Sequence, residues 1–269
     1  MSRLTDTLRA AVARGDRAFI PFLPAGYPDM QTSELALAAM ARAGADAVEI
    51  GVPFADSLAD GPVVQGAYHQ ALARGASLEA TLALVRRLSS AGFPPIVLMV
   101  AYNVIYRVGL ERFSAMAREA GAAAILPPDL PVEEWCGLAG ALAAHELDGI
   151  RLVAPTTTAA RLGSVLQGAT GFVYYISRKG VTGAQQTLPP DLEASLAQLR
   201  VATPLPVAVG FGISTPAQAA AVGRIADGVI VGSALLQALE GGVEPCAALA
   251  SELRAALQSL GSLAPPPSP

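Results

Sequence analysis

The sequence predicts an α/β fold, a single-domain (β/α)8 TIM barrel with extra helices at the N-terminus and after strand 2. Eight short apolar runs are each followed by a longer run rich in Ala and Leu, with Gly, Pro or Asp at the turns between them. The apolar runs are nearly continuous rather than alternating, which is typical of parallel strands buried on both faces. A chain of 269 residues is also long enough for such a barrel. The predicted strands are Ala18–Leu23, Asp46–Gly51, Ile96–Val100, Ala122–Leu126, Gly149–Val153, Gly171–Ile176, Pro206–Gly210 and Asp227–Val231.

The longer runs predict one helix after each strand. Pro62 and Pro216 suit the first turn of a helix, where the missing N–H costs nothing. The eight predicted helices are Gln31–Arg42, Leu78–Ser90, Leu110–Glu119, Val132–His145, Ala159–Gln167, Pro190–Arg200, Pro216–Val222 and Ala234–Leu239, and the three extra helices are Leu4–Arg14, Pro62–Leu72 and Cys246–Leu257. We expect residues 1–263 to form the catalytic domain and the Pro-rich tail 264–269 to be disordered.

A doubly wound open sheet is the alternative fold. It usually carries a Gly-rich dinucleotide loop after its first strand, and the segment Phe22–Pro28 is not such a loop. The barrel is therefore favoured. In a barrel the active site lies at the C-terminal ends of the strands, and the unusual polar segments of this chain all fall there.

Composition excludes some partners and favours others. A net charge of −4 gives no reason to expect nucleic acid or an anionic membrane. With only 15% charged residues, little polar surface is available, which favours a protein partner. The long uncharged runs contain Pro and Gly and do not resemble membrane helices, and the N-terminus has no apolar secretory core, so we expect a cytoplasmic protein. Cys136 and Cys246 lie far apart, and we expect two buried thiols without a disulfide.

Two carboxylates, Glu49 and Asp60, are the first candidates for chemistry. Glu49 lies in an apolar run at the end of the second predicted strand, and Asp60 follows in a loop rich in Pro and Gly. A carboxylate in apolar surroundings is costly unless it has a partner or a use, and two carboxylates in different environments can divide acid and base work. The structural alternative is a core-edge Glu with a backbone partner and a turn-forming Asp.

Two Gly turns predict a phosphate site. Gly210-Phe211-Gly212 follows the seventh predicted strand and Gly232-Ser233 follows the eighth, each before a helix. Barrels often bind phosphate at these loops through bare backbone N–H groups and a helix N-terminus. Neither turn contains Lys or Arg, so the site would work through backbone groups. Ordinary left-handed turns are the alternative.

The histidines argue against other chemistries. His69 and His145 lie in helical stretches away from these loops. Their placement argues against a His-based triad and against a metal site. Any chemistry is therefore expected from carboxylates, tyrosine and backbone dipoles.

Two long motifs resemble the signatures of the tryptophan synthase α subunit family. They are Glu49-Ile50-Gly51-Val52-Pro53-Phe54-Ala55-Asp56 with Leu58-Ala59-Asp60-Gly61-Pro62, and Ser177-Arg178-Lys179-Gly180-Val181-Thr182-Gly183. Asp129-Leu130-Pro131, Ala154-Pro155-Thr156-Thr157, Gly210-Phe211-Gly212-Ile213 and Gly232-Ser233 also fit in order, so the resemblance runs from about Phe19 to Leu257. It implies a (β/α)8 barrel and a lyase that cleaves indole-3-glycerol phosphate to indole and glyceraldehyde 3-phosphate in tryptophan biosynthesis.

The resemblance also implies partners and residue roles. Indole would pass to a β subunit that carries pyridoxal phosphate, in an α2β2 tetramer, while this chain would need no cofactor and no metal of its own. The implied catalytic residues are Glu49 as general acid and base, Asp60 facing the indole N–H, and Tyr174 near the substrate hydroxyls. The implied substrate-binding residues are Phe22 and Phe211 at the indole, Thr182 in a loop that closes on Asp60, and Gly183, Gly212, Gly232 and Ser233 at the phosphate. We expect the loop 178–188 to be mobile without ligand.

Two positions depart from the family pattern. Ser57 and Val104 stand where proline is usual, both on the side expected to face the β subunit. Three other functions are alternatives: a different phosphate-binding barrel enzyme, which should lack the Glu49–Asp60 motif; a non-catalytic scaffold, which should have lost one of the two carboxylates; and a stand-alone indole-releasing lyase.

Overall fold

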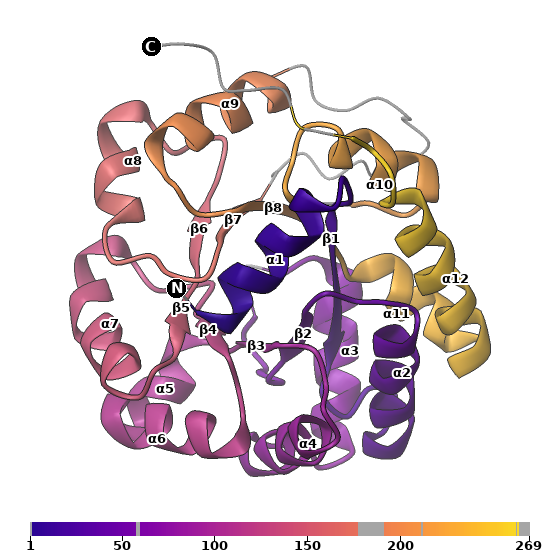
Figure 1. The fold of residues 1–269 in the computed structure, drawn as a ribbon. Coiled ribbons are helices and arrows are strands. Elements are labelled where there is room, and N and C mark those ends of the chain that lie inside the picture. The colour runs from indigo at the N-terminus through magenta and orange to yellow at the C-terminus, as the bar shows by residue number, and fades with distance from the viewer. Residues whose placement is uncertain (1, 58–59, 177–190, 211, 262, 264–269) are drawn as a thin grey trace.

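The computed structural model describes residues 2–57, 60–176, 191–210, 212–261 and 263, and these residues form a parallel β-barrel surrounded by helices (Figure 1). The nine strands in this part of the chain join in the order β5-β4-β3-β2-β1-β9-β8-β7-β6, and every pair is parallel. The strands are β1 (Ala18–Pro24), β2 (Val48–Gly51), β3 (Ile96–Met99), β4 (Ala124–Leu126), β5 (Asp148–Gly149), β6 (Arg151–Val153), β7 (Val173–Ile176), β8 (Val207–Gly210) and β9 (Gly228–Val231). The predicted α/β barrel is confirmed.

The fifth predicted strand is divided in two. Asp148–Gly149 pairs with β4, Arg151–Val153 pairs with β7, and Ile150 lies between them. The N–H of Ile150 still donates to the carbonyl of Ile125 at 2.9 Å, so the chain passes directly from one end of the sheet to the other. The eight predicted strands therefore appear as nine strands in the described part of the chain. The sixth, seventh and eighth predicted strands are β7, β8 and β9.

The helices follow the predicted alternation with a few changes. A short helix, α5, was not predicted, because its seven residues are too few to show helical periodicity. The predicted helix Val132–His145 begins with a turn of 3-10 helix, η1, and the last helix begins at Val243 rather than Cys246. The helices are α1 (Arg3–Ala13), α2 (Met30–Arg42), α3 (Pro62–Ala73), α4 (Leu78–Ser90), α5 (Tyr102–Val108), α6 (Leu110–Ala120), η1 (Val132–Glu134), α7 (Trp135–Ala144), α8 (Ala159–Leu166), α9 (Leu192–Ala202), α10 (Pro216–Gly223), α11 (Ser233–Glu240) and α12 (Val243–Ala256).

Local chemistry explains where several helices begin. Pro62 and Pro216 occupy the first turns of α3 and α10, as predicted. At α10 the hydroxyl of Thr215 accepts from the N–H of Gln218, and the Gln218 side chain accepts from the N–H of Thr215. This reciprocal capping satisfies helix donors that would otherwise lack partners.

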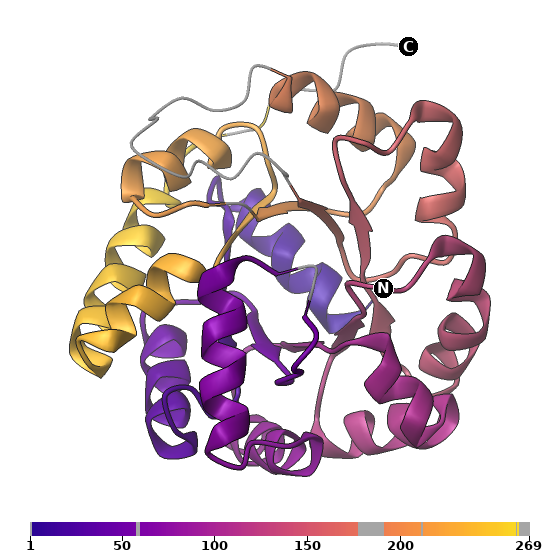
Figure 2. The same cartoon turned by 180° about the vertical axis from the view of Figure 1, so that it is seen from behind.

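Helix α1 covers the N-terminal end of the barrel. In Figure 1 it crosses in front of the strands, whereas α3 lies in front when the molecule is seen from behind in Figure 2. Leu4, Leu8 and Ala11 on α1 are fully buried. The hydroxyl of Thr5 donates to the carbonyl of Gly171, just before β7, at 2.8 Å. One end of the barrel is thus closed, which leaves the C-terminal end for a site.

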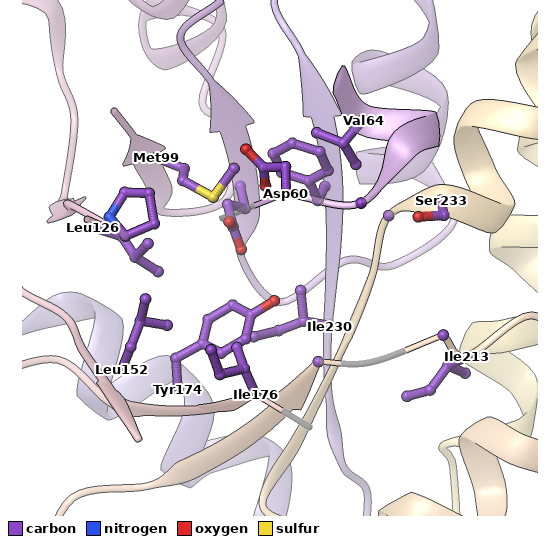
Figure 3. A pocket seen from close by; sticks show the side chains of 17 residues that line it. Asp60, Val64, Met99, Leu126, Leu152, Tyr174, Ile176, Ile213, Ile230 and Ser233 are labelled. Atoms are coloured by element: carbon purple, nitrogen blue, oxygen red, sulfur yellow. The ribbon is translucent and has the colours of Figure 1, made fainter. Parts of the chain in front are cut away.

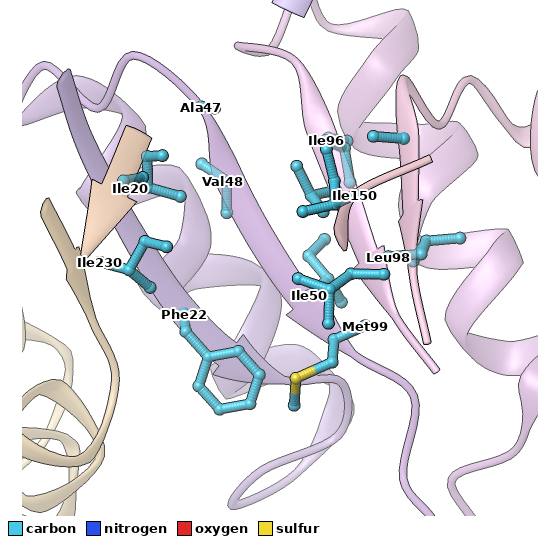
Figure 4. Packing of buried hydrophobic residues seen from close by; sticks show 14 of the residues in the cluster. Ile20, Phe22, Ala47, Val48, Ile50, Ile96, Leu98, Met99, Ile150 and Ile230 are labelled. Atoms are coloured by element: carbon cyan, nitrogen blue, oxygen red, sulfur yellow. The ribbon is translucent and has the colours of Figure 1, made fainter. Parts of the chain in front are cut away.

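The core is formed by aliphatic side chains on both faces of the strands. Figure 4 shows Ile20, Val48, Ile50, Ile96 and Leu98 packed on neighbouring strands. All five are almost completely buried. Burial of such side chains from both faces explains why the strand sequences are continuously apolar.

The prediction of two buried thiols is half wrong. Both cysteines are free and Cys246 is buried, but Cys136 is exposed on α7. A helix surface next to an Ala-rich stretch gives no strong signal of which face points outward, because Ala is common on both.

No helix in the described part of the chain is long and apolar enough to cross a membrane. The tail 264–269 and the loop 178–188 lie outside the described residues, so those two expectations stay predictions.

Candidate active site

A cavity of about 230 Å³ lies at the C-terminal ends of the strands, opposite α1. Figure 3 shows Met99, Leu126 and Leu152 on one side of it and Ile213 and Ser233 on the other, with Tyr174 between them. The lining residues in the described part of the chain are Phe22, Glu49, Asp60, Gly61, Val64, Met99, Leu126, Pro128, Leu152, Tyr174, Ile176, Gly210, Gly212, Ile213, Ile230, Gly232 and Ser233. None of these is Lys, Arg or His, so the charged side chains of the lining are carboxylates.

Glu49 lies on β2 and is 1% exposed. Its Oε2 has no hydrogen-bond partner among the described residues. Asp46, three residues earlier, shows the contrast. Its Oδ2 accepts from the N–H of Phe19 at 2.9 Å and from Arg254 at 3.0 Å, as a structural carboxylate does. An unpartnered buried carboxylate is expensive, which favours a functional role for Glu49 over the structural alternative.

The environment keeps Glu49 protonated at neutral pH. Burial, together with the nearby charge of Asp60, raises the pKa of Glu49 from 4.5 to about 8. The neutral form is the cheaper one in an apolar site that offers no cation. Glu49 can therefore donate a proton to a bound molecule and take one back afterwards.

Asp60 is partly buried in the loop just before α3. Burial, with the charge of Asp129 as the second cause, raises the pKa of Asp60 from 3.8 to about 6. Asp60 is thus mainly ionised at neutral pH while Glu49 is mainly protonated. The pair offers an acid and an anion on one cavity, and that arrangement suits acid catalysis of a reaction that develops positive charge nearby.

Two tyrosine hydroxyls lie against glycines at strand ends. The Tyr174 hydroxyl lies against Gly210 on β8, where a Cβ would collide with it, and the Tyr68 hydroxyl lies in the same way against Gly51 on β2. Burial and the charges of the two carboxylates raise the pKa of both phenols well above 10, so both remain neutral donors. Tyr174 lines the cavity, whereas its neighbour Tyr175 is buried on the other face of β7.

The predicted phosphate-binding residues lie together where β8 and β9 end. Gly212 has a φ of +25°, which favours glycine, and Gly232 precedes the first residue of α11, Ser233. A Cβ at Gly232 would lie 2.8 Å from the ring of Phe22, so a side chain there would crowd the cavity. The first N–H groups of a helix lack internal partners and attract anions.

The structure brings together seven of the ten residues predicted for the site. All seven line the same cavity: Phe22, Glu49, Asp60, Tyr174, Gly212, Gly232 and Ser233. Thr182, Gly183 and Phe211 lie outside the described residues. His69 is exposed on α3 and bonds the carbonyl of Ala55, and His145 is paired with Glu111, so neither histidine lines the cavity.

Sequence reasoning missed the apolar wall of the cavity. Met99, Leu126, Leu152, Ile176 and Ile230 are strand-end residues that line it. The available signal was their position, because the last inward-facing residue of each barrel strand borders the C-terminal mouth. Tyr68 was missed as well, since a helical tyrosine gives no sign in sequence of where its hydroxyl points.

No group of three or more His, Cys, Asp or Glu that could hold a metal ion is present among the described residues. The polar groups that converge on the cavity are instead two carboxylates, a phenol, and backbone groups beside glycines. This set suits proton transfer to and from a bound molecule, with an anionic group held by the backbone N–H groups.

Comparison with known proteins gives one consistent family. Residues 8–263 match the family model for the tryptophan synthase alpha chain. The chain is 47% identical over 240 residues to the tryptophan synthase alpha chain of Citrifermentans bemidjiense, covering 89% of this chain and 90% of that one. It is 48% identical over 238 residues to the same protein of Gloeobacter violaceus, covering 88% and 86%. Among solved structures it is similar to tryptophan synthase of Mycobacterium tuberculosis, with a TM-score of 0.90 and 38% identity over 96% of this chain and 98% of that one.

Proposed function

The chain belongs to the tryptophan synthase alpha chain family, the lyases that cleave indole-3-glycerol phosphate in tryptophan biosynthesis, and from this premise we propose which of its residues perform the cleavage. The observation that carries the proposal is the buried Glu49, without a partner for Oε2 among the described residues, on the same cavity as Asp60. The Glu49–Asp60 motif is also the feature that a different phosphate-binding barrel enzyme should lack.

Glu49 acts first as an acid and then as a base. Its proton goes to the ring carbon that carries the glycerol chain, which leaves a cationic ring and a Glu49 carboxylate. That carboxylate then takes the proton of the adjacent glycerol hydroxyl. The carbon–carbon bond breaks, its electrons return to the ring, and indole and glyceraldehyde 3-phosphate are released. Glu49 ends protonated, as it began, which agrees with the raised pKa of about 8.

Asp60 stabilises the cation between these steps. The positive charge of the protonated ring is shared by the ring N–H, and an ionised carboxylate that accepts from this N–H lowers the energy of the intermediate. With a pKa of about 6, Asp60 is ionised at the pH where Glu49 still holds its proton. A scaffold without activity would have no need of two carboxylates with such different proton affinities.

The remaining contacts place the substrate. The apolar residues of the lining, Phe22 and Leu126 among them, take the indole ring, and Gly212, Gly232 and Ser233 take the phosphate. Tyr174 lies between these ends, where its neutral hydroxyl can bond the glycerol hydroxyls. The roles expected of Phe211, Thr182 and Gly183 rest on the family motif alone.

We also propose the wider setting. Residues 1–263 act as one catalytic domain. The protein works in the cytoplasm, because its substrate is a charged phosphate ester that does not cross a membrane. A β subunit that carries pyridoxal phosphate receives the indole in an α2β2 tetramer, so this chain supplies no cofactor. The exposed side chain of Tyr106 on α5, which is 69% accessible, agrees with a partner surface at this helix.

Indole release from indole-3-glycerol phosphate tests the function. The purified chain should release indole, and an added β subunit should increase the rate. Full activity without a partner would support the stand-alone lyase, and no indole in either case would contradict the proposal. Glu49→Gln is the matched control for background cleavage.

A further inference from the structure

A second, smaller cavity lies on another side of Asp60. Its volume is about 130 Å³, and it shares Asp60, Met99 and Pro128 with the active-site cavity. Asp129 lines this second cavity but not the first. The proposed mechanism gives Asp129 no role, although its side chain faces the same small space as a catalytic carboxylate.

Asp129 is held in place by the backbone of a neighbouring loop. Its Oδ1 accepts from the N–H of Tyr102, the first residue of α5, at 2.7 Å. The residue before that helix, Ala101, has no side chain that could cap it. Asp129 therefore replaces the missing cap from the loop after β4.

The other groups that face Asp60 do not offset this charge. They are Glu49 on β2, Tyr68 on α3 and Tyr174 on β7, with Asp56 on its own loop at the second cavity. None of the described residues that line either cavity is Lys, Arg or His. A fixed negative charge in this setting disfavours ionisation of Asp60, and the raised pKa of Asp60 has the charge of Asp129 as its second cause after burial.

We propose that Asp129 is a positioning residue: it caps α5 from the loop after β4, and the carboxylate held in this way acts through its charge on Asp60, which lines the same cavity. The catalytic consequence rests on the proposed function of Asp60; the electrostatic link does not. Asp129 is exposed, so its effect on Asp60 is screened by salt.

Three variants separate charge from capping. Asp129→Asn removes the charge but keeps an oxygen that can accept from Tyr102, whereas Asp129→Ala removes both. Asp56→Asn is the matched control, because it removes one carboxylate from the same cavity without touching the α5 cap. The measurement is the pKa of the Asp60 side chain, from its ¹³C carboxyl shift in the full chain as pH is varied.

Both Asp129 variants should lower the Asp60 pKa by about half a unit, because a like charge is lost. Asp56→Asn should change it less, and only Asp129→Ala should lower the melting temperature. In the wild-type chain, 1 M salt should lower the Asp60 pKa, because it screens the charge of Asp129. The Asp60 pKa values of wild type and Asp129→Asn should then lie closer together. This comparison does not require Asp129→Ala to fold. An unchanged Asp60 pKa in Asp129→Asn, or an equal fall in Asp56→Asn, would overturn the proposal.

The acid limb of kcat/KM then tests Asp60 itself. It should move to lower pH by the same amount as the measured pKa. A shifted pKa with an unmoved acid limb would retain the electrostatic link and reject the catalytic role of Asp60, so the two failures are distinguishable.

Discussion

Glu49 and Asp60 line one cavity and hold their protons with different strength, with pKa values raised to about 8 and about 6. The difference follows from their positions, because Glu49 is enclosed on β2 and Asp60 is only partly buried in the loop just before α3. At neutral pH the first is an acid and the second an anion, the two states that the proposed cleavage needs.

The pH dependence of kcat/KM should be bell-shaped. Asp60 must be ionised, so activity should fall below about pH 6, and Glu49 must be protonated, so activity should fall above about pH 8. Initial rates of indole release from pH 4.5 to 10 check both limbs. A rate that stays constant up to pH 10 would exclude Glu49 as the acid.

Glu49 should also affect folding stability. Its folded pKa is raised from 4.5, so the folded state holds this proton more tightly than the unfolded state. The stabilisation is fully present below about pH 4.5 and is lost as pH rises through about 8. Glu49→Gln has no carboxyl proton to lose, so only the wild type loses this stabilisation at high pH. The unfolding free energy of Glu49→Gln minus that of wild type should therefore rise between pH 5 and pH 9 by on the order of 4 kcal/mol. Urea unfolding at both pH values measures this, and a constant difference would argue against a buried, protonated Glu49.

Asp60→Asn should reduce kcat by about 10²–10³-fold, because a neutral amide does not balance the cation that forms on the ring. KM should change much less, since the interaction strengthens only as charge develops. Steady-state kinetics separate the two constants. A rise in KM alone would make Asp60 a residue for substrate binding only.

The phosphate end of the cavity should be sensitive to a single methyl group. Gly232→Ala places a Cβ within 2.8 Å of the Phe22 ring, at the entrance to α11, and should weaken the binding of glycerol phosphate at least about tenfold. Gly163→Ala on α8 is the control, because a Cβ there meets nothing within 4 Å. Calorimetry measures both affinities, and equal values would place the phosphate elsewhere.

The barrel could be predicted because its physical cause repeats along the chain. Continuous apolar runs such as Ile96–Val100 indicate strands buried on both faces, and eight repeats leave few other folds. The helix α5 could not be predicted, since its N-terminus is capped by Asp129 from a distant loop and seven residues carry no periodicity. The division of the fifth strand at Ile150 is equally invisible to hydrophobic pattern.

Part of the candidate site could be predicted for a similar reason. Glu49 and Gly232 are unusual residues at strand ends, and strand ends meet at one mouth of a barrel. The proximity of Tyr68 to Gly51 and of Tyr174 to Gly210 depends on side-chain directions that only the folded chain fixes. The proton affinities of Glu49 and Asp60 likewise depend on burial and on neighbouring charges, so the sequence could not show how far apart the two pKa values lie.

The most direct test of the account is the turnover of Glu49→Gln. Removing the group that both gives and takes the proton should lower kcat by about 10²–10⁴-fold or more, while affinity for glycerol phosphate stays unchanged because the proposed phosphate contacts are Gly212, Gly232 and Ser233 and not Glu49. Single-turnover indole release and calorimetry on the same preparation measure the two quantities together. A kcat within about tenfold of wild type, with binding intact, would contradict the assignment of Glu49 as the acid and base of this reaction.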